Sequence, residues 1–234
     1  MKTTRSNKTV QNPKLSETSA QKKNRMRRIL SGLKKLYPQA TCALRHEHPF
    51  QLLVATILSA QCTDEIVNKV TPVLFERYVT PVDLAGADPP DVESIIHSTG
   101  FFRQKTKSLL AASRKIVEEF DGRVPDTMDA LLKLPGVARK TANVVLGTAF
   151  GKNEGVVVDT HVGRLATRLD FTWSAKNAKD AVKIERDLME IVPRDEWTYL
   201  SHALIWHGRQ VCFARKPNCA QCILADSCPS AGKI

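Results

Sequence analysis

A tight turn that leads directly into a basic helix start is the sequence feature that most limits how this chain can fold. Residues 134–151 read LPGVARKTANVVLGTAFG, and the residues that follow the turn have the composition of a helix. Residues 126–132 begin with a capping aspartate and end in apolar positions, so two helices should be joined through Pro135 and Gly136. The pattern predicts a helical hairpin with a tight turn.

The predicted turn has the features of a phosphate site. Gly136 has no Cβ and lets another backbone approach closely, and the N–H groups of Val137 and Ala138 should lie unpaired at the positive end of the second helix. Arg139 and Lys140 add two positive side chains to the first helical turn. An ordinary helical hairpin with a Pro-Gly turn has the same local pattern, so the turn alone leaves both interpretations open.

Apolar residues recur at helical spacing through most of the chain. Further helices are predicted for residues 25–37, 49–60, 64–78, 91–98, 103–120, 126–132, 160–169, 177–191 and 193–207. Residues 49–60 are apolar nearly all round, which predicts a buried central helix. Apart from the brief run of valines at 156–158, no stretch alternates over strand length, so the expected fold class is all-α.

The net charge of +11 is concentrated near the beginning of the chain. Residues 1–28 contain nine Lys or Arg and one Glu, whereas the remaining residues are only mildly basic. Residues 1–20 have few apolar positions and should form a disordered basic arm, which either adds non-specific phosphate affinity or is simply solvated. A mitochondrial transit peptide is a third alternative, although the arm lacks an apolar face.

No targeting or membrane segment is expected. The longest apolar run, residues 50–60, falls well short of the roughly 18 residues that a membrane span requires. No signal-peptide pattern opens the chain. We therefore expect a protein without membrane association, located in the cytoplasm at a bacterial nucleoid, or in the nucleus or mitochondrion of a eukaryote.

Four of the six cysteines fall within the last 23 residues, with the spacing C-x6-C-x2-C-x5-C. They are Cys212, Cys219, Cys222 and Cys228. Without a secretory signal, disulfides are not expected, and four converging thiolates predict a metal centre, either zinc or a [4Fe–4S] cluster. Arg215 and Lys216 place positive charge where a phosphate could meet this loop. Cys42 and Cys62 lie far upstream and are expected to be core thiols.

Three segments together resemble the endonuclease III family of DNA repair glycosylases: LPGVARKTA, VDTHVGR at residues 158–164, and the cysteine loop. The resemblance extends over most of the chain and favours the [4Fe–4S] cluster over zinc. It implies two helical domains after the arm: residues 42–153, which contain a helix-hairpin-helix motif, and residues 21–41 with 154–234, which hold the cluster.

The same resemblance implies specific DNA contacts. The turn residues that would grip the DNA backbone are Leu134, Gly136, Val137, Ala138 and Arg139, joined by Arg164, Arg215 and Lys216. Ala138 stands where the family usually has a second glycine, and its methyl group could crowd an approaching phosphate. Damaged bases are flipped out of the stack, and SAQCTD (59–64) and STGFF (98–102) resemble the segments that fill the gap. Gln61 would take the place of the flipped base, and Phe101 or Phe102 would wedge the opposite strand.

Lys140 and Asp159 are implied to be the catalytic pair, facing each other across a cleft. A lysine amine attacks C1′ of the sugar and forms a Schiff base, and a carboxylate stabilises the developing oxocarbenium ion. The neighbouring Arg139 and the positive helix end should disfavour the ammonium form of Lys140. Position alone would make Lys140 a phosphate contact and Asp159 a helix N-cap, and a capping aspartate can also be catalytic.

The implied function is a bifunctional DNA glycosylase and abasic-site lyase. It would act as a monomer on double-stranded DNA that contains abasic sites or oxidised pyrimidines such as thymine glycol. Two alternatives stay open at this point. A monofunctional adenine glycosylase of the same superfamily would lack a lysine at position 140, and a non-enzymatic Fe–S DNA-binding protein would need neither Lys140 nor Asp159.

Overall fold

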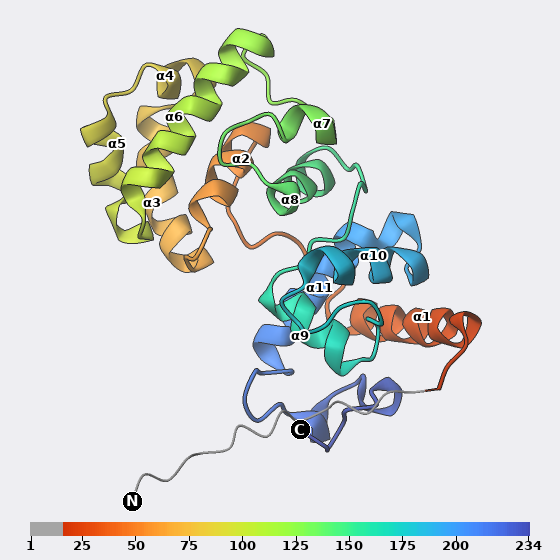
Figure 1. Ribbon diagram of the computed structural model, residues 1–234. Helices are drawn as coiled ribbons and strands as arrows, with labels where there is room; N and C mark the ends of the chain where they lie inside the picture. Colours follow the sequence, from red (N-terminus) through yellow and green to blue (C-terminus); the bar gives the residue numbers. More distant parts are fainter. Residues whose placement is uncertain (1–15) are drawn as a thin grey trace, which may run out of the picture. The chain divides into compact units, whose positions relative to one another are not determined.

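The computed structural model describes residues 16–234, which form two compact units. The first unit combines the described residues up to Ala40 with Val156–Ile234, and the second unit is Thr41–Gly155. All regular elements of the described residues are α-helices or short 3₁₀ helices (Figure 1), so the predicted all-α fold is confirmed. Residues 1–15 of the predicted arm lie outside the described residues.

The first helix begins before its predicted start at residue 25. Thr18 caps α1 (Ser19–Leu36), since its Oγ1 accepts from the Gln21 N–H at 3.3 Å and Gln21 Oε1 accepts from the Thr18 N–H at 2.8 Å. This reciprocal pair is a capping box, which satisfies two backbone donors at once. Residues 18–20, expected in the disordered arm, therefore belong to the first helix and its cap.

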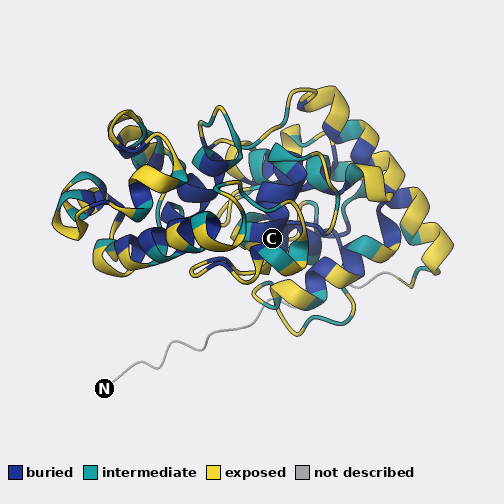
Figure 2. Cartoon of the chain, turned by 90° about the horizontal axis from the view of Figure 1, so that it is seen from above, coloured by how far each residue is buried: buried dark blue, intermediate teal, exposed yellow. Residues whose placement is uncertain are grey.

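Four helices share the core of the first unit. Besides α1 they are α9 (Thr160–Arg168), α10 (Ala181–Ile191) and α11 (Trp197–Gln210). The apolar stripe of α1, with Met26, Ile29 and Leu33 at most 1% exposed, packs into one cluster with side chains of the other three helices. Figure 2 shows the result as helices that are buried on one side and exposed on the other. Burial of such stripes supplies most of the stability of short helices.

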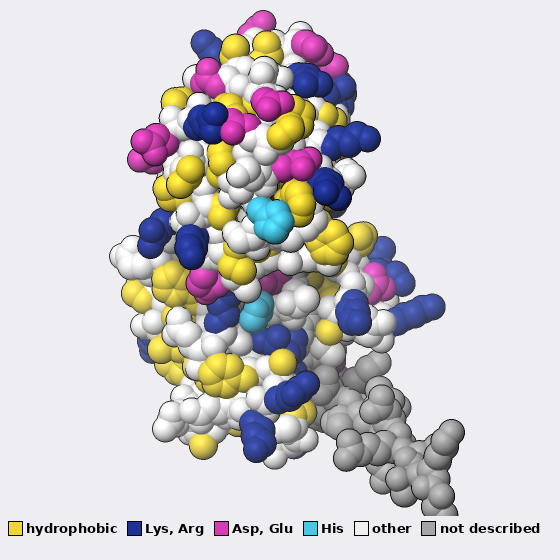
Figure 3. Space-filling view, turned by 90° about the vertical axis from the view of Figure 1, so that its left-hand side faces the viewer, with side chains coloured by type: hydrophobic (Ala, Val, Ile, Leu, Met, Phe, Trp, Pro, Cys, Tyr) yellow, Lys and Arg dark blue, Asp and Glu magenta, His cyan; other side chains and the backbone are white. Residues whose placement is uncertain are grey.

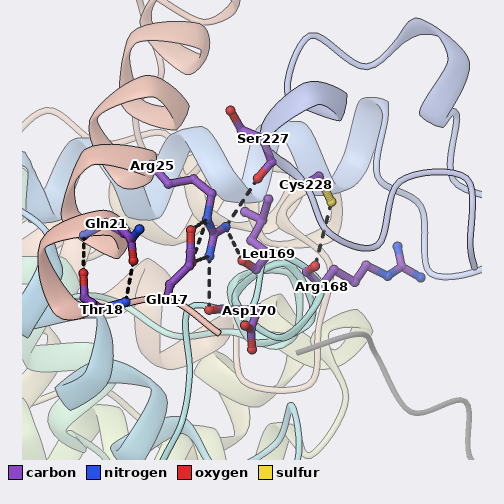
Figure 4. A network of polar contacts seen from close by, with 9 residues as sticks. All are labelled: Glu17, Thr18, Gln21, Arg25, Arg168, Leu169, Asp170, Ser227 and Cys228. Atoms are coloured by element: carbon purple, nitrogen blue, oxygen red, sulfur yellow. Dashed lines mark hydrogen bonds and ion pairs between the residues drawn. The ribbon is translucent and has the colours of Figure 1, made fainter. Parts of the chain in front are cut away.

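A buried arginine fastens α1 to two distant segments (Figure 4). Arg25 is 3% exposed, and its Nη1 donates to the Leu169 carbonyl at 2.5 Å and to the Ser227 carbonyl at 3.3 Å. Its guanidinium lies 4.1 Å from the centre of the Phe171 ring and pairs with Glu17 at 2.6 Å. The hydrogen bond from Arg25 holds the pKa of the Glu17 carboxyl below its ordinary value. The arginine thus links α1, the end of α9 and the cysteine loop, residues 212–228.

The second unit contains seven α-helices and the 3₁₀ helix His97–Thr99 within the described residues. The α-helices are α2 (Pro49–Leu58), α3 (Asp64–Arg77), α4 (Pro81–Ala85), α5 (Pro89–Ile96), α6 (Phe102–Glu119), α7 (Met128–Leu131) and α8 (Arg139–Ala149). As predicted, α2 is the buried helix, with all residues from Leu52 to Leu58 buried. Figure 1 shows α6 running beside α4 and α5, and α8 packs on α2.

Several local expectations were wrong. The helix predicted from residue 177 begins at Ala181, and the helix predicted from residue 193 opens with a 3₁₀ turn, Arg194–Glu196, before α11. The α4 helix was missed because it has only five residues. Trp173 is 43% exposed, and the Lys22 ammonium lies 5.0 Å from its ring centre.

Cys42 and Cys62 are partly exposed rather than core thiols. The valines at 156–158 are buried in the first unit without forming a strand. Among the described residues, no helix is both long and apolar enough to pass through a lipid bilayer.

Candidate functional site

The turn between α7 and α8 is held by its own backbone. The Val137 N–H donates to the Leu134 carbonyl at 3.1 Å, so the prediction that this N–H is unpaired was wrong. The Leu134 and Val137 side chains are 2% and 8% exposed, whereas Pro135, Gly136 and Ala138 are exposed. The side chains of Leu134 and Val137 are therefore packed inside the second unit.

Gly136 is required by the packing of the turn as well as by its backbone angle. Its φ is +79°, a left-handed conformation that favours glycine. A Cβ at this position would lie 2.8 Å from the Ser108 Cβ in α6, which is closer than two carbons can stand. The close approach predicted for Gly136 is thus made to α6 of the same unit.

The start of α8 combines positive side chains with exposed backbone. Ala138 is the N-cap, with an extended backbone and no side-chain cap. Arg139 and Lys140 form the exposed first residues of the helix. The first N–H groups of a helix lack partners inside the helix and lie at its positive end, so they attract anions. The opposite face of α8, including Val145 and Leu146, is buried and fixes the direction of this helix.

Asp159 caps α9, as the sequence predicted. Its Oδ1 accepts from the N–H groups of His161 and Val162, both at 2.8 Å. The residue is half-buried, and a carboxylate at a helix N-terminus is stabilised by the helix dipole. The cap therefore holds a carboxylate at a defined position in the first unit.

The predicted DNA contact Arg164 is used inside the protein. Its Nη2 donates to the carbonyls of Gly208 at 2.9 Å and Cys212 at 3.0 Å, and lies 3.1 Å from His161 Nδ1. Burial lowers the pKa of both Arg164 and His161. These contacts favour a structural role for Arg164, which joins α9 to the end of α11 and to the first cysteine of the loop.

Gln61 and Phe101, two of the three residues predicted to enter the DNA stack, are exposed and have a left-handed backbone. Gln61 has a φ of 53°, and Phe101 has a φ of 49° and is 67% exposed. Such angles are uncommon outside glycine and often occur at functional sites. The Phe102 ring instead lies 4.4 Å from the His97 ring and is half-buried. Of the two phenylalanines, Phe101 is therefore the exposed one.

The four cysteines of the loop line a single cavity. None of the four forms a disulfide. Burial raises the pKa of the Cys222 and Cys228 thiols, and the charge of the other cysteines raises it further. Four close thiolates thus need a cationic group between them. Over residues 16–234 no His, Cys, Asp or Glu group is arranged to hold a single metal ion. The donor set fits a [4Fe–4S] cluster, which distributes four thiolates over its irons.

Further groups contact the cysteine sulfurs. Arg168 Nη1 donates to Cys212 Sγ at 3.2 Å and to the Phe213 carbonyl at 2.7 Å. His207 Nε2 lies 3.4 Å from Cys222 Sγ, and burial lowers the pKa of His207 to about 4. Outer groups of this kind orient ligands and tune a metal centre. Sequence reasoning missed both contacts, because Arg168 and His207 lie 44 and 15 residues from their cysteine partners.

A second missed residue is Lys105, which is 5% exposed in α6. Its Nζ donates to the carbonyls of Leu58 and Thr99, both at 2.8 Å. One signal in the sequence could have revealed it: Lys105 shares its helix face with Leu109 and Ala112, at apolar spacing. A lysine on such a face has to find polar partners inside the fold.

Comparison with known proteins identifies the class. Residues 54–194 match the model of the HhH-GPD superfamily base excision DNA repair protein, and residues 212–228 match the iron-sulfur binding domain of endonuclease III. The chain is thus a helix-hairpin-helix base excision repair protein. Endonuclease III of Synechocystis sp. is 60% identical over 212 residues, which cover 91% of this chain and 95% of the relative. Endonuclease III of Bacillus subtilis is 44% identical over 200 residues, covering 85% and 89%.

Solved structures agree with these relatives. A non-covalent endonuclease III–DNA complex has a TM-score of 0.82 at 42% identity, covering 88% of this chain and 94% of the other. A trapped endonuclease III–DNA covalent intermediate gives 0.81 at 42% identity, covering 88% and 95%. The chain belongs to the endonuclease III family.

Membership of this family decides between the alternatives that the sequence left open. The protein is a base excision repair enzyme with DNA glycosylase and abasic-site lyase activities, and it binds DNA. Its cofactor is a [4Fe–4S] cluster rather than zinc. A non-enzymatic Fe–S protein and a monofunctional glycosylase are therefore excluded.

Proposed function

We propose that Lys140 is the nucleophile and Asp159 the catalytic carboxylate in the excision of oxidised pyrimidines, such as thymine glycol, from duplex DNA. The observation that carries this proposal is the position of Lys140. It is exposed on the first turn of α8, directly after a turn whose Gly136 and Ala138 are exposed and whose N-cap has no side-chain hydrogen bond. A DNA backbone bound at this turn would bring sugar carbons close to the lysine amine.

The chemistry follows from an amine and a carboxylate. The neutral Nζ of Lys140 attacks C1′, the C1′–N bond breaks, and the base leaves with the bonding electrons and takes up a proton. The Asp159 carboxylate stabilises the positive charge that develops on the sugar. Loss of a proton from nitrogen and opening of the sugar ring give a Schiff base between Lys140 and C1′. Removal of a C2′ proton then expels the 3′ phosphate, and water releases the lysine.

The charge distribution supports a DNA surface that involves the first unit. Its described residues contain 18 Lys or Arg and 10 Asp or Glu, whereas the second unit contains 13 and 14. Figure 3 shows one face of each unit, with Lys and Arg predominant on the first and acidic side chains interspersed on the second. Arg215 and Lys216 are exposed in the cysteine loop, and we assign phosphate contacts to them.

In the second unit, we assign backbone contacts with DNA to the turn residues Leu134, Gly136, Val137 and Ala138, and a side-chain contact to Arg139. Gln61 would take the place of the flipped base, and Phe101 would wedge the opposite strand. The exposure of both side chains supports these assignments.

The cluster would be held by Cys212, Cys219, Cys222 and Cys228, which line one cavity. We assign it a structural role, since the loop contributes only Leu224 as a fully buried apolar side chain. When bound, the cluster neutralises and cross-links the four thiolates.

We also propose that the two units are the two domains of a monomer that acts on damaged bases and abasic sites in the cytoplasm. The separate buried cores of the two units support the division into domains. Sedimentation with and without a lesion duplex would test the monomer, since a dimer would appear as a doubled mass.

The catalytic assignment can be tested with Lys140→Gln, using Lys133→Gln as a matched control. Lys133 is an exposed lysine just before the turn. Lys140→Gln should lose thymine glycol excision and borohydride trapping on abasic DNA while retaining DNA affinity. The control should keep both activities. Trapping by Lys140→Gln at the wild-type level would refute the nucleophile assignment.

A further inference from the structure

One buried ammonium joins the two segments that carry the exposed Gln61 and Phe101. Lys105 Nζ donates to the carbonyl of Leu58, the last residue of α2, and to that of Thr99, each at 2.8 Å. Leu58 directly precedes the Gln61 loop, residues 59–63, and Thr99 lies within the Phe101 loop, residues 97–101. Both loops and Lys105 belong to the second unit.

Each loop is already closed locally by its own hydrogen bonds. In the Gln61 loop, the Cys62 N–H donates to the Ser59 carbonyl at 3.1 Å. In the Phe101 loop, the Gly100 N–H donates to the His97 carbonyl at 3.3 Å, and Thr99 Oγ1 donates to the Ile96 carbonyl at 2.8 Å. These bonds set the shape of each loop, whereas the two bonds of Lys105 connect one loop to the other.

Retaining a cation at this position is costly, which argues for a purpose. Lys105 is 5% exposed, and burial lowers its pKa. An apolar residue on this face of α6 would avoid the desolvation cost. An ammonium has three donors and no acceptor, so it can serve two carbonyls at once, which no apolar side chain can do.

We propose that Lys105 is a positioning residue that fixes the separation of the Gln61 loop and the Phe101 loop, so that both side chains enter the DNA together during base flipping. The inference rests on the proposed roles of Gln61 and Phe101. Both residues have positive φ, a conformation that persists only where the surrounding structure enforces it. A wedge and a plug that act on the two strands of one duplex need a fixed spacing, and Lys105 sets this spacing in advance of binding.

The test compares Lys105→Met with Lys107→Met, an exposed lysine of the same helix. Amide hydrogen exchange of the free proteins should rise in both loops of Lys105→Met and in neither loop of the control. Single-turnover excision of a lesion in a fully paired duplex should fall by about 10- to 100-fold, the order expected for a small misplacement of positioning groups. Excision from a bubble, where the lesion is already unstacked, should fall far less because flipping has been made easy.

Lys105→Arg, which keeps a cationic donor, should recover part of the activity on the paired duplex. If Lys105→Met does not fold, the same comparison is made with Lys105→Gln, which keeps an N–H donor but lacks the reach of lysine.

Several results would overturn the inference. Equal losses on duplex and bubble would show general damage to the fold, and increased exchange in only one loop would show that the loops are not tied together. Gln61→Ala and Phe101→Ala identify the source of a failure. Flipping is followed by the fluorescence of 2-aminopurine placed next to the lesion. If Gln61→Ala and Phe101→Ala impair flipping but Lys105→Met does not, Lys105 has no positioning role and the proposed function stands. If neither they nor Lys105→Met impair flipping, the roles of Gln61 and Phe101 fail together with the inference.

Discussion

Replacing Gly136 with alanine tests how the turn between α7 and α8 is held. The alanine would have to adopt a φ of +79°, which costs about 1 to 2 kcal/mol for a residue with a Cβ. Its Cβ would also lie 2.8 Å from the Ser108 Cβ, and such overpacking costs about 1 to 3 kcal/mol. Alanine also restricts the unfolded chain more than glycine does, and this entropy effect offsets less than about 1 kcal/mol of the loss. The expected net loss is about 2 to 4 kcal/mol, or roughly 5 to 15 °C in Tm for a chain of this size.

Gly122→Ala is the matched control for this substitution. Gly122 has a φ of +71°, but a Cβ there would meet nothing within 4 Å. It therefore carries the conformational cost without the clash and should lose only about 1 kcal/mol. Urea unfolding followed by far-UV circular dichroism measures both variants.

The contact with α6 can be tested separately by removing the Ser108 side chain. Ser108→Gly should weaken α6 slightly by itself. In the Gly136→Ala background it should restore part of the lost stability, because the clashing Cβ is gone. Equal stability losses for Gly136→Ala and Gly122→Ala, or strict additivity of Gly136→Ala and Ser108→Gly, would refute the close-packing argument.

The remaining predictions concern the cap of α9, a buried carboxylate, the cluster and the arm. Asp159→Asn should leave urea stability nearly unchanged, since asparagine caps about as well as aspartate, but lower single-turnover excision by about 100-fold; full activity would reduce Asp159 to a cap. Burial acts to raise the pKa of Asp187, but hydrogen bonds from Ser174, Thr172 and Trp173 outweigh it and hold that pKa below its ordinary value. Asp187→Asn should therefore lower the free energy of unfolding by about 2 to 4 kcal/mol at pH 7. In urea titrations, this stability difference from wild type should shrink as the pH falls below the unfolded-state pKa of about 4. A stability difference that does not depend on pH would contradict this. Arg168→Met should lose iron to a chelator about 10-fold faster than the control Arg186→Met, as measured from the visible absorbance of the cluster. Equal rates would show that the N–H···S contact is dispensable. Deleting residues 1–15, which spares the Thr18 cap, should flatten the salt dependence of non-specific DNA binding and leave excision intact; a collapse of excision would place the arm in the active enzyme.

The sequence predicted features that depend on near neighbours in the chain. The burial of α2, the Asp159 cap and the turn at Gly136 follow from periodicity, capping preference and backbone freedom, which act within a few residues. The cysteine spacing likewise placed the metal loop. Family resemblance then supplied the cluster type and the activity, which local patterns left open.

Features that depend on tertiary partners could not be predicted. Arg25 hydrogen-bonds carbonyls 144 and 202 residues away, so its burial has no local signal. The apolar face of α6 signals that Lys105 is buried, but not that Leu58, 47 residues away, is one of its partners. The internal bonds of Arg164 likewise reach carbonyls 44 and 48 residues away. The exposed position of Trp173 also depends on a distant partner, since its ring lies under the Lys22 ammonium.

The Arg25 network has a consequence for how the protein is made. α1 is synthesised early, but its core partners and the Ser227 carbonyl come from the last third of the chain. The second unit, Thr41–Gly155, is continuous and leaves the ribosome in between, so it can fold while α1 still has no partner. The cysteine loop emerges after every element to which it is anchored. Iron delivery should therefore be a late, post-translational step, and a nascent chain stalled before residue 212 should already protect the second unit from proteolysis.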